Sequence, residues 1–163
     1  MGTATATATE VRVRAAKKSD AAALAMIDAH HSGGSPKRSW WDDVIARHLK
    51  APKAGGGRVG LVAVEGPKDR VVGFVFGQVR AFEFGSEPCG WIYAVGVHPD
   101  CLRKGVAGAL ARAALKAFKS LGAPVVRTMV RADDVPVLTF FRSQGFAAGP
   151  YVELELSLGE NPR

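Results

Sequence analysis

The sequence has 163 residues, of which 47% are hydrophobic and 23% are charged. This length suits one domain with a substantial core, and the composition is ordinary for a soluble globular protein. No run approaches the ~20 apolar residues that span a membrane. Residues 1–10 lack the basic segment followed by an apolar segment that is typical of a signal peptide. The two cysteines do not have the spacing of metal ligands and are too few for a disulfide framework. We therefore expect a reduced, cytoplasmic protein with a disordered tail over residues 1–10, a single domain over residues 11–159 and no metal site.

The net charge of +7 favours an anionic partner. The basic residues do not form one dense block, and aromatic residues do not alternate with them as they would in a nucleic-acid-binding surface. Charge alone leaves a nucleic acid and a phosphate-rich cofactor as alternatives.

The first predicted element is a strand over Val11–Ala15, where Val and Arg alternate strictly. Ser19-Asp20 offers a helix cap before Ala21–Ala29, which is rich in Ala, Leu, Met and Ile. The segment His31–Ser39 contains Gly-Gly and Ser-Pro and is predicted to be a loop. A second short helix is predicted over Trp41–Leu49.

Three strand-like runs follow, and a Gly-Pro turn with charged residues joins the first two as a hairpin. The runs are Val59–Glu65, Val71–Phe84 and Gly90–Val97. The clearest helix is Gly105–Leu121, because apolar residues at helical spacing share one face and Lys and Arg share the other.

The C-terminal part predicts a strand over Val125–Val130, a helix that is capped by Asp133 or Asp134 and runs to Gln144, and a strand over Tyr151–Leu158, where polar and apolar residues alternate. This order of elements favours an α/β fold whose central sheet carries helices on both faces.

The segment between the third strand-like run and the long helix holds the strongest chemical signal. The first turn of a helix leaves backbone N–H groups unpaired and carries partial positive charge. Gly105, Ala107 and Gly108 have small or no side chains, so a pyrophosphate can approach those groups, and Arg103 and Lys104 add positive charge. A helix start that only packs tightly is the alternative. This segment contains neither Gly-x-Gly-x-x-Gly nor Gly-Lys-Ser/Thr, so it is not a dinucleotide fingerprint or a P-loop.

These residues resemble the GNAT superfamily of acetyl-CoA-dependent N-acetyltransferases. Its signature is a strand that ends in Val-x-Pro, followed by Gln/Arg-x-x-Gly-x-Gly/Ala at the start of a long helix. Val97-His98-Pro99 and Gly105-Val106-Ala107 match this signature, while Leu102 stands at the Gln/Arg position.

A second motif of the family, Asn-x-x-Ala-x-x-x-Tyr followed by Gly-Phe, has a counterpart about 40 residues later. Val130-Arg131-Ala132 and Gly145-Phe146 match the surrounding pattern. Asp134 replaces the Asn, Val137 the Ala and Phe141 the Tyr. The resemblance covers nearly the whole domain, with the elements in the same order.

The resemblance implies an α/β (α+β) fold with a mixed central sheet of about six to seven strands flanked by about four helices. A splayed strand pair, Gly90–Val97 and Val125–Val130, would hold acetyl-CoA, with its pantetheine arm paired to β-strand main chain. The implied cofactor-binding residues are Val95, Gly96, Val97, Arg103, Lys104, Gly105, Val106, Ala107, Gly108, Asp134 and Phe141.

The implied activity is transfer of an acetyl group to a primary amine by direct attack in a ternary complex, with coenzyme A as product. A backbone N–H near Val97 would stabilise the oxyanion. Phe141 has no proton to give to the leaving thiolate, so Tyr93, or alternatively Tyr151, is expected to replace it. Glu83 is the expected base, with Glu87, His30, His31 and water-mediated deprotonation as alternatives.

The acceptor stays open between a small amine, an amino acid and a protein amino group, although the second motif resembles the branch that acetylates protein amino termini. A homodimer is compatible with the resemblance, and neither a nucleic acid nor a membrane is an expected partner. The departures at Leu102, Asp134 and Phe141 keep one alternative in play, a weakly active or non-catalytic relative that binds or senses acetyl-CoA.

Overall fold

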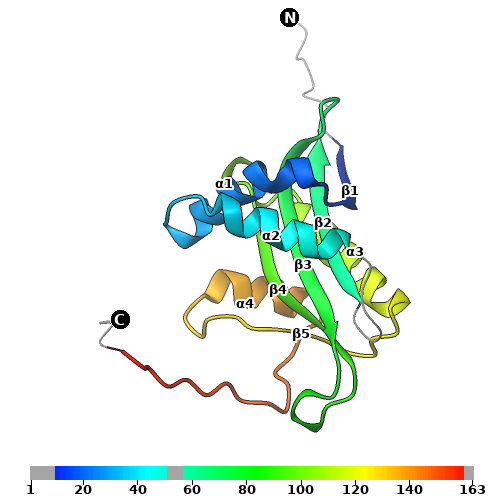
Figure 1. Ribbon diagram of the computed structural model, residues 1–163, viewed down its shortest axis with the longest axis vertical. Helices are drawn as coiled ribbons and strands as arrows, with labels where there is room; N and C mark the ends of the chain where they lie inside the picture. Colours follow the sequence, from blue (N-terminus) through cyan, green and yellow to red (C-terminus); the bar gives the residue numbers. More distant parts are fainter. Residues whose placement is uncertain (1–9, 51–56, 160–163) are drawn as a thin grey trace, which may run out of the picture. The chain divides into compact units, whose positions relative to one another are not determined.

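The computed structural model describes residues 10–50 and 57–159, so residues 1–9 of the predicted tail lie outside the described residues. The chain divides into two compact units, residues 1–129 and residues 130–163 (Figure 1). Within the described residues, no helix is long and apolar enough to cross a membrane.

The first unit is built on a five-stranded mixed sheet in the order β1-β2-β3-β4-β5. Strands β1 to β4 pair with one another in antiparallel fashion, and β5 is parallel to β4. The strands are β1 (Val11–Ala15), β2 (Arg58–Glu65), β3 (Arg70–Arg80), β4 (Cys89–Val97) and β5 (Val126–Thr128).

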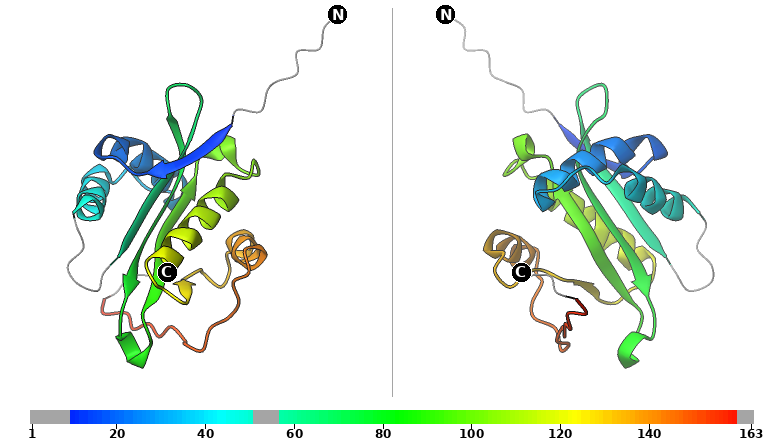
Figure 2. Two further views of the ribbon diagram at one scale, coloured as in Figure 1. Left: turned by 90° about the vertical axis from the view of Figure 1, so that its right-hand side faces the viewer. Right: turned by 60° about the vertical axis from the view of Figure 1, so that its left-hand side comes forward.

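Helices cover both faces of this sheet, as Figure 2 shows. One face carries α1 (Ala21–Ser32) and α2 (Arg38–Leu49), and the other carries α3 (Val106–Ser120). The face of α3 that the sequence predicts to be apolar is buried, with Leu110 and Phe118 inaccessible to solvent. The predicted long helix is therefore confirmed.

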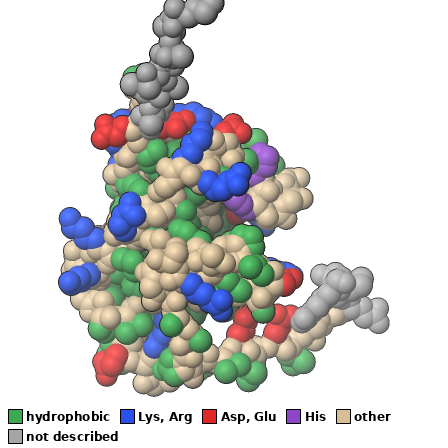
Figure 3. All heavy atoms as spheres, turned by 180° about the vertical axis from the view of Figure 1, so that it is seen from behind, with side chains coloured by type: hydrophobic (Ala, Val, Ile, Leu, Met, Phe, Trp, Pro, Cys, Tyr) green, Lys and Arg blue, Asp and Glu red, His purple; other side chains and the backbone are tan. Residues whose placement is uncertain are grey.

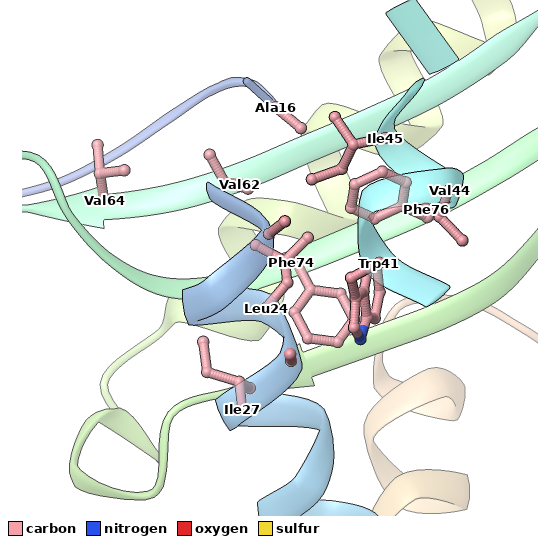
Figure 4. Packing of buried hydrophobic residues seen from close by; sticks show 12 residues of the cluster. Ala16, Leu24, Ile27, Trp41, Val44, Ile45, Val62, Val64, Phe74 and Phe76 are labelled. Carbon is pink, nitrogen blue, oxygen red and sulfur yellow. The ribbon is translucent and has the colours of Figure 1, made fainter. Parts of the chain in front are cut away.

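The core between α1, α2 and the sheet is an aromatic cluster (Figure 4). The Trp41 ring packs edge-on against Phe74 and Phe76, with ring centroids 4.7 and 5.3 Å apart. Leu24 and Ile27 of α1 complete the cluster. Full burial of such side chains contributes about 1.5–3 kcal/mol each, so this cluster anchors both helices to the sheet.

The second unit contains α4 (Val135–Ser143). Asp134 caps this helix, because its carboxylate accepts a hydrogen bond of 3.2 Å from the Val137 amide. The ring of Phe141 packs edge-on against Phe140 and Phe146, at centroid distances of 5.2 and 5.1 Å.

The predicted final strand over Tyr151–Leu158 is wrong for this structure, and the sheet has five strands rather than six or seven. Leu154, Leu156 and Leu158 of this segment are each more than 80% exposed. Alternation alone does not make a strand, because a strand also needs a neighbour that satisfies its backbone groups. In the described part of the chain, none of residues 151–158 belongs to a strand.

Several predicted boundaries and one predicted cap also differ from the structure. The run Val71–Phe84 stops pairing at Arg80, because a short 3-10 turn begins at Glu83. The second helix begins at Arg38, three residues early. Asp20 does not cap α1 with its side chain, because its carboxylate is paired with Arg14 through hydrogen bonds of 2.8 and 2.9 Å.

Candidate functional site

Among the described residues, the C-terminal half of β4 pairs with no strand on the side away from β3, and we call this side the open edge. On one side β4 pairs with β3 as far as Val97 opposite Gly73. On the other side its pairing with β5 ends at Ile92 opposite Thr128, whose hydroxyl donates a 3.1 Å hydrogen bond to the Ile92 carbonyl. The edge of β4 from residue 93 to residue 97 is therefore not paired with β5.

The direction of the backbone groups along this edge follows from the antiparallel ladder. The His98 amide donates to the Val72 carbonyl at 2.8 Å, so His98 faces β3. Because alternate residues face opposite edges, the amide and carbonyl of Val95 and Val97 point toward the open edge, and those of Gly96 point toward β3. Of the three predicted pantetheine-binding residues, Val95 and Val97 therefore direct their amide and carbonyl groups toward the open edge.

Tyr93 is the extra residue of a β-bulge at the start of the open edge. Ala94 lies opposite Phe76, but Ile92 lies opposite the next residue of β3, Gly77. A bulge bends the strand, increases its twist and re-aims a side chain. Here it coincides with the point at which β4 and β5 stop pairing.

The start of α3 follows directly from the end of β4 through a 3-10 turn at Pro99–Cys101. Gly105 adopts the left-handed region with φ of 79°, which favours glycine, and serves as the N-cap of α3. The first-turn amides have no partner inside the helix. Arg103 and Lys104 are exposed beside them. The residues from 103 to 108 thus join positive side chains to free amides, as the sequence predicts.

His31 lies against the outer end of the open edge. Its Nε2 is 2.8 Å from the Val97 carbonyl oxygen and 3.4 Å from the Val97 amide nitrogen. The sequence analysis named His31 only as an alternative base. The contact joins residues 66 positions apart, and no local pattern signals it.

Tyr93 contacts a residue that the sequence analysis did not single out. Its hydroxyl lies 3.3 Å from Nε2 of His48, which is in the last turn of α2. Burial lowers the pKa of His48 below its ordinary value, although the nearby carbonyl oxygens of Val44 and Gly77 act in the opposite direction. Burial also raises the pKa of Tyr93 above its ordinary value. Both side chains are therefore neutral near pH 7.

Glu83 lies at the tip of the β3–β4 hairpin, beyond the last paired residues, Arg80 and Cys89. Its carboxylate is 3.6 Å from the Arg80 guanidinium. Tyr93 is four residues further along β4 than Cys89, which is about 13 Å at the rise of a strand. The two predicted catalytic residues thus lie in different parts of the hairpin, and the role of Glu83 stays a prediction.

Asp134 and Phe141 belong to the second unit, where one caps α4 and the other packs against aromatic rings. Their predicted roles at the cofactor stay predictions. Among the residues that the structure describes, no group of three or more His, Cys, Asp or Glu side chains could hold a metal ion. Figure 3 shows the Lys and Arg side chains of one face as separate groups, with hydrophobic and uncharged surface between them.

Comparison with known proteins finds acetyltransferases among the similar sequences. A mycothiol acetyltransferase of Saccharomonospora viridis is 34% identical over 90 residues, which are 53% of this chain and 29% of that protein. One of Pseudarthrobacter chlorophenolicus is 32% identical over 111 residues, 68% of this chain and 29% of that protein. The chain spans under a third of the length of these relatives.

Solved structures share the fold at low sequence identity. An aminoglycoside N-acetyltransferase in complex with CoA has a TM-score of 0.76 at 15% identity, over 94% of this chain and 99% of that one. The Acetyltransferase (GNAT) family matches residues 24–146, most of the chain. The family match covers both the open edge of β4 and the glycine-capped helix that follows it. The chain therefore belongs to the GNAT acetyltransferase family.

Proposed function

We propose that this protein is an N-acetyltransferase that moves an acetyl group from acetyl-CoA to a primary amine of a small molecule. The observation that carries the proposal is the unpaired edge of β4 next to the uncovered start of α3. Membership of the GNAT family supports the choice of acetyl-CoA as donor.

The residues present fit this donor at both ends. Outward-facing backbone groups of Val95 and Val97 offer donors and acceptors for an amide-containing arm, in the manner of an added strand. The first-turn amides of α3, with Arg103 and Lys104 beside them, suit a pyrophosphate. Bound there, acetyl-CoA would supply an activated acetyl group as a thioester, which an amine can attack directly.

The chain's own residues would then perform two tasks. An outward N–H of β4, such as that of Val97, would hold the developing oxyanion, as the sequence predicts. Tyr93, at the bulge where the open edge begins, is the ionisable side chain of β4 best placed to move a proton.

A small-molecule acceptor is supported by the names of the similar proteins, which include mycothiol acetyltransferases and aminoglycoside N-acetyltransferases. One observation favours a second function, binding of acetyl-CoA without turnover. Phe141 stands where the family motif has its tyrosine, so the family's usual proton donor to the thiolate is missing.

Release of free thiol from acetyl-CoA tests the proposal. The panel contains glucosamine, free amino acids, linear polyamines and peptides with free amino termini, and mass spectrometry identifies the product. We expect amine-dependent thiol release together with an acetylated product 42 mass units heavier than the amine, about the mass of an added acetyl group less one hydrogen. Tight binding of acetyl-CoA without acceleration by any amine would leave the non-catalytic function instead.

A further inference from the structure

We infer that Tyr93 and His48 form a two-residue proton relay that removes the proton from the acceptor ammonium. Tyr93 takes this proton, and His48 is a positioning residue that acts through Tyr93. This inference rests on the proposed function. It is carried by the tautomer that the contacts impose on His48 and by the place of Tyr93 on β4.

The contacts of His48 fix which nitrogen carries its proton. Nδ1 lies 2.8 Å from the Val44 carbonyl oxygen, which can only accept a hydrogen bond, so Nδ1 is the donor. In the neutral ring, Nε2 is then an acceptor. The group beside it that can donate is the Tyr93 hydroxyl, at 3.3 Å. The proton of Tyr93 is therefore directed to His48 rather than to a thiolate.

The same site accommodates the protonated ring. Nε2 is also 3.3 Å from the Gly77 carbonyl oxygen. While the ring is neutral, Nε2 carries no proton that it could donate to this oxygen. When His48 becomes an imidazolium, Nδ1 still donates to Val44 and Nε2 gains a proton that can be donated to Gly77. The Gly77 carbonyl oxygen can therefore accept a hydrogen bond from the charged form of His48.

Packing holds the His48 ring in this orientation. It lies edge-on against Phe76, with ring centroids 4.9 Å apart. Gly60 leaves room for it, because a Cβ at that position would lie 3.2 Å from Cδ2 of His48 and 2.9 Å from the Phe76 ring. The charged groups whose fields act on His48 are Arg47 and Arg58, and both disfavour its protonation.

One N–H bond of the acceptor ammonium breaks, and its proton passes to the Tyr93 oxygen as the original hydroxyl proton passes to Nε2 of His48. The amine nitrogen is left with the lone pair that attacks the thioester. Tyr93 ends the step neutral and His48 ends it protonated, and His48 then returns its proton to solvent through Tyr93, which is 40% exposed.

Steady-state kinetics of thiol release, with the best amine of the panel, test this inference. The variants are Tyr93→Phe, His48→Gln and the double variant, with Arg38→Gln as the control on the same helix. Arg38 forms only an exposed pair with Asp42, so the control should leave kcat unchanged. We expect each single variant to lose about 10²-fold in kcat, with KM for acetyl-CoA unchanged. The double variant should lose no more than either single variant, because the two residues act as one unit.

The pH profile separates a relay from a structural contact. Wild-type kcat should fall with decreasing pH as His48 becomes protonated, below its ordinary pKa of 6.5, and this limb should vanish in His48→Gln. Three results would each overturn the inference. They are a loss in kcat of less than about 3-fold in Tyr93→Phe, losses that multiply in the double variant, and an acidic limb that is removed by Glu83→Gln instead.

A measurement without turnover keeps the two proposals distinguishable. In ¹⁵N-histidine NMR of the free protein, we expect His48 as the Nδ1–H tautomer, with an Nε2 signal that shifts in Tyr93→Phe. The opposite tautomer would overturn the relay even if acetyl transfer is found. The expected tautomer in a protein that acetylates no amine would show that the proposed function, and with it the use of the relay, is wrong.

Discussion

His31 covers the backbone groups of Val97 that face the open edge of β4. Its Nε2 approaches the Val97 carbonyl oxygen to 2.8 Å, which is a full hydrogen bond when Nε2 carries the proton. A ligand that paired with β4 as an added strand would compete with this contact. The residue therefore reduces the affinity of the edge for such a ligand.

We predict that His31→Ala binds acetyl-CoA about 2- to 10-fold more tightly, because a neutral hydrogen bond that need no longer be broken is worth about 0.5–1.5 kcal/mol. Isothermal titration calorimetry measures the change, and His30→Ala is the matched control on the same turn of α1. Weaker binding in His31→Ala would mean that this imidazole contacts the bound ligand instead.

Two elements, β1 and the turn that precedes α1, are joined by one ion pair. Arg14 of β1 binds Asp20 through hydrogen bonds of 2.8 and 2.9 Å, and the Lys17 amide donates to the same carboxylate at 2.7 Å. Burial acts to raise the pKa of Asp20, but the bonds from Arg14 and Lys17 outweigh it, so the pKa lies below its ordinary value of 3.8. The ionised carboxylate thus fixes how the chain enters α1.

We predict that Asp20→Asn lowers the free energy of unfolding at pH 7 by about 2 kcal/mol, the usual worth of hydrogen bonds to a charged group. Because the folded-state pKa is depressed, this contribution is fully present above pH 3.8 and is lost as pH falls through the lower folded value. Urea unfolding at pH 7 and in the acid range checks both points. A deficit in Asp20→Asn that stays constant through the acid range would contradict this account, and Asp42→Asn, at the exposed pair with Arg38, is the control.

The whole molecule carries a net charge of +7, and on the face that Figure 3 shows the basic side chains form separate groups. Such a field attracts an anionic donor and repels a polycationic acceptor. The repulsion between exposed charges weakens as salt shortens the screening length, which is about 10 Å at 0.1 M.

We therefore predict that a zwitterionic or singly charged amine has a higher kcat/KM than a linear polyamine at low salt, and that added salt raises kcat/KM for the polyamine alone. Thiol-release kinetics across a salt series provide the measurement. Faster reaction of the polyamine at low salt would point to a local acidic acceptor site that overrides the net charge.

The local features of the donor side could be predicted from the sequence. The position at which α3 begins and the face of α3 that is buried could be predicted from the small residues and from the helical spacing of the apolar residues. Both signals depend only on neighbours in the chain. The order of the elements also followed, because hydrophobic periodicity is a local signal. The same logic failed for Tyr151–Leu158, where the alternating residues form no strand, because a strand also depends on pairing between segments that are distant in the sequence.

By itself, then, the sequence determined the family, the donor class and the segment that begins α3. Only the tertiary structure decided that β5 stops pairing at Ile92, that the groups of Val97 face His31, and that Tyr93 meets His48. The physical reason is the range of the interactions. Register, bulges and contacts between residues 45 or 66 positions apart depend on how whole elements pack, and no spacing along the chain encodes that packing.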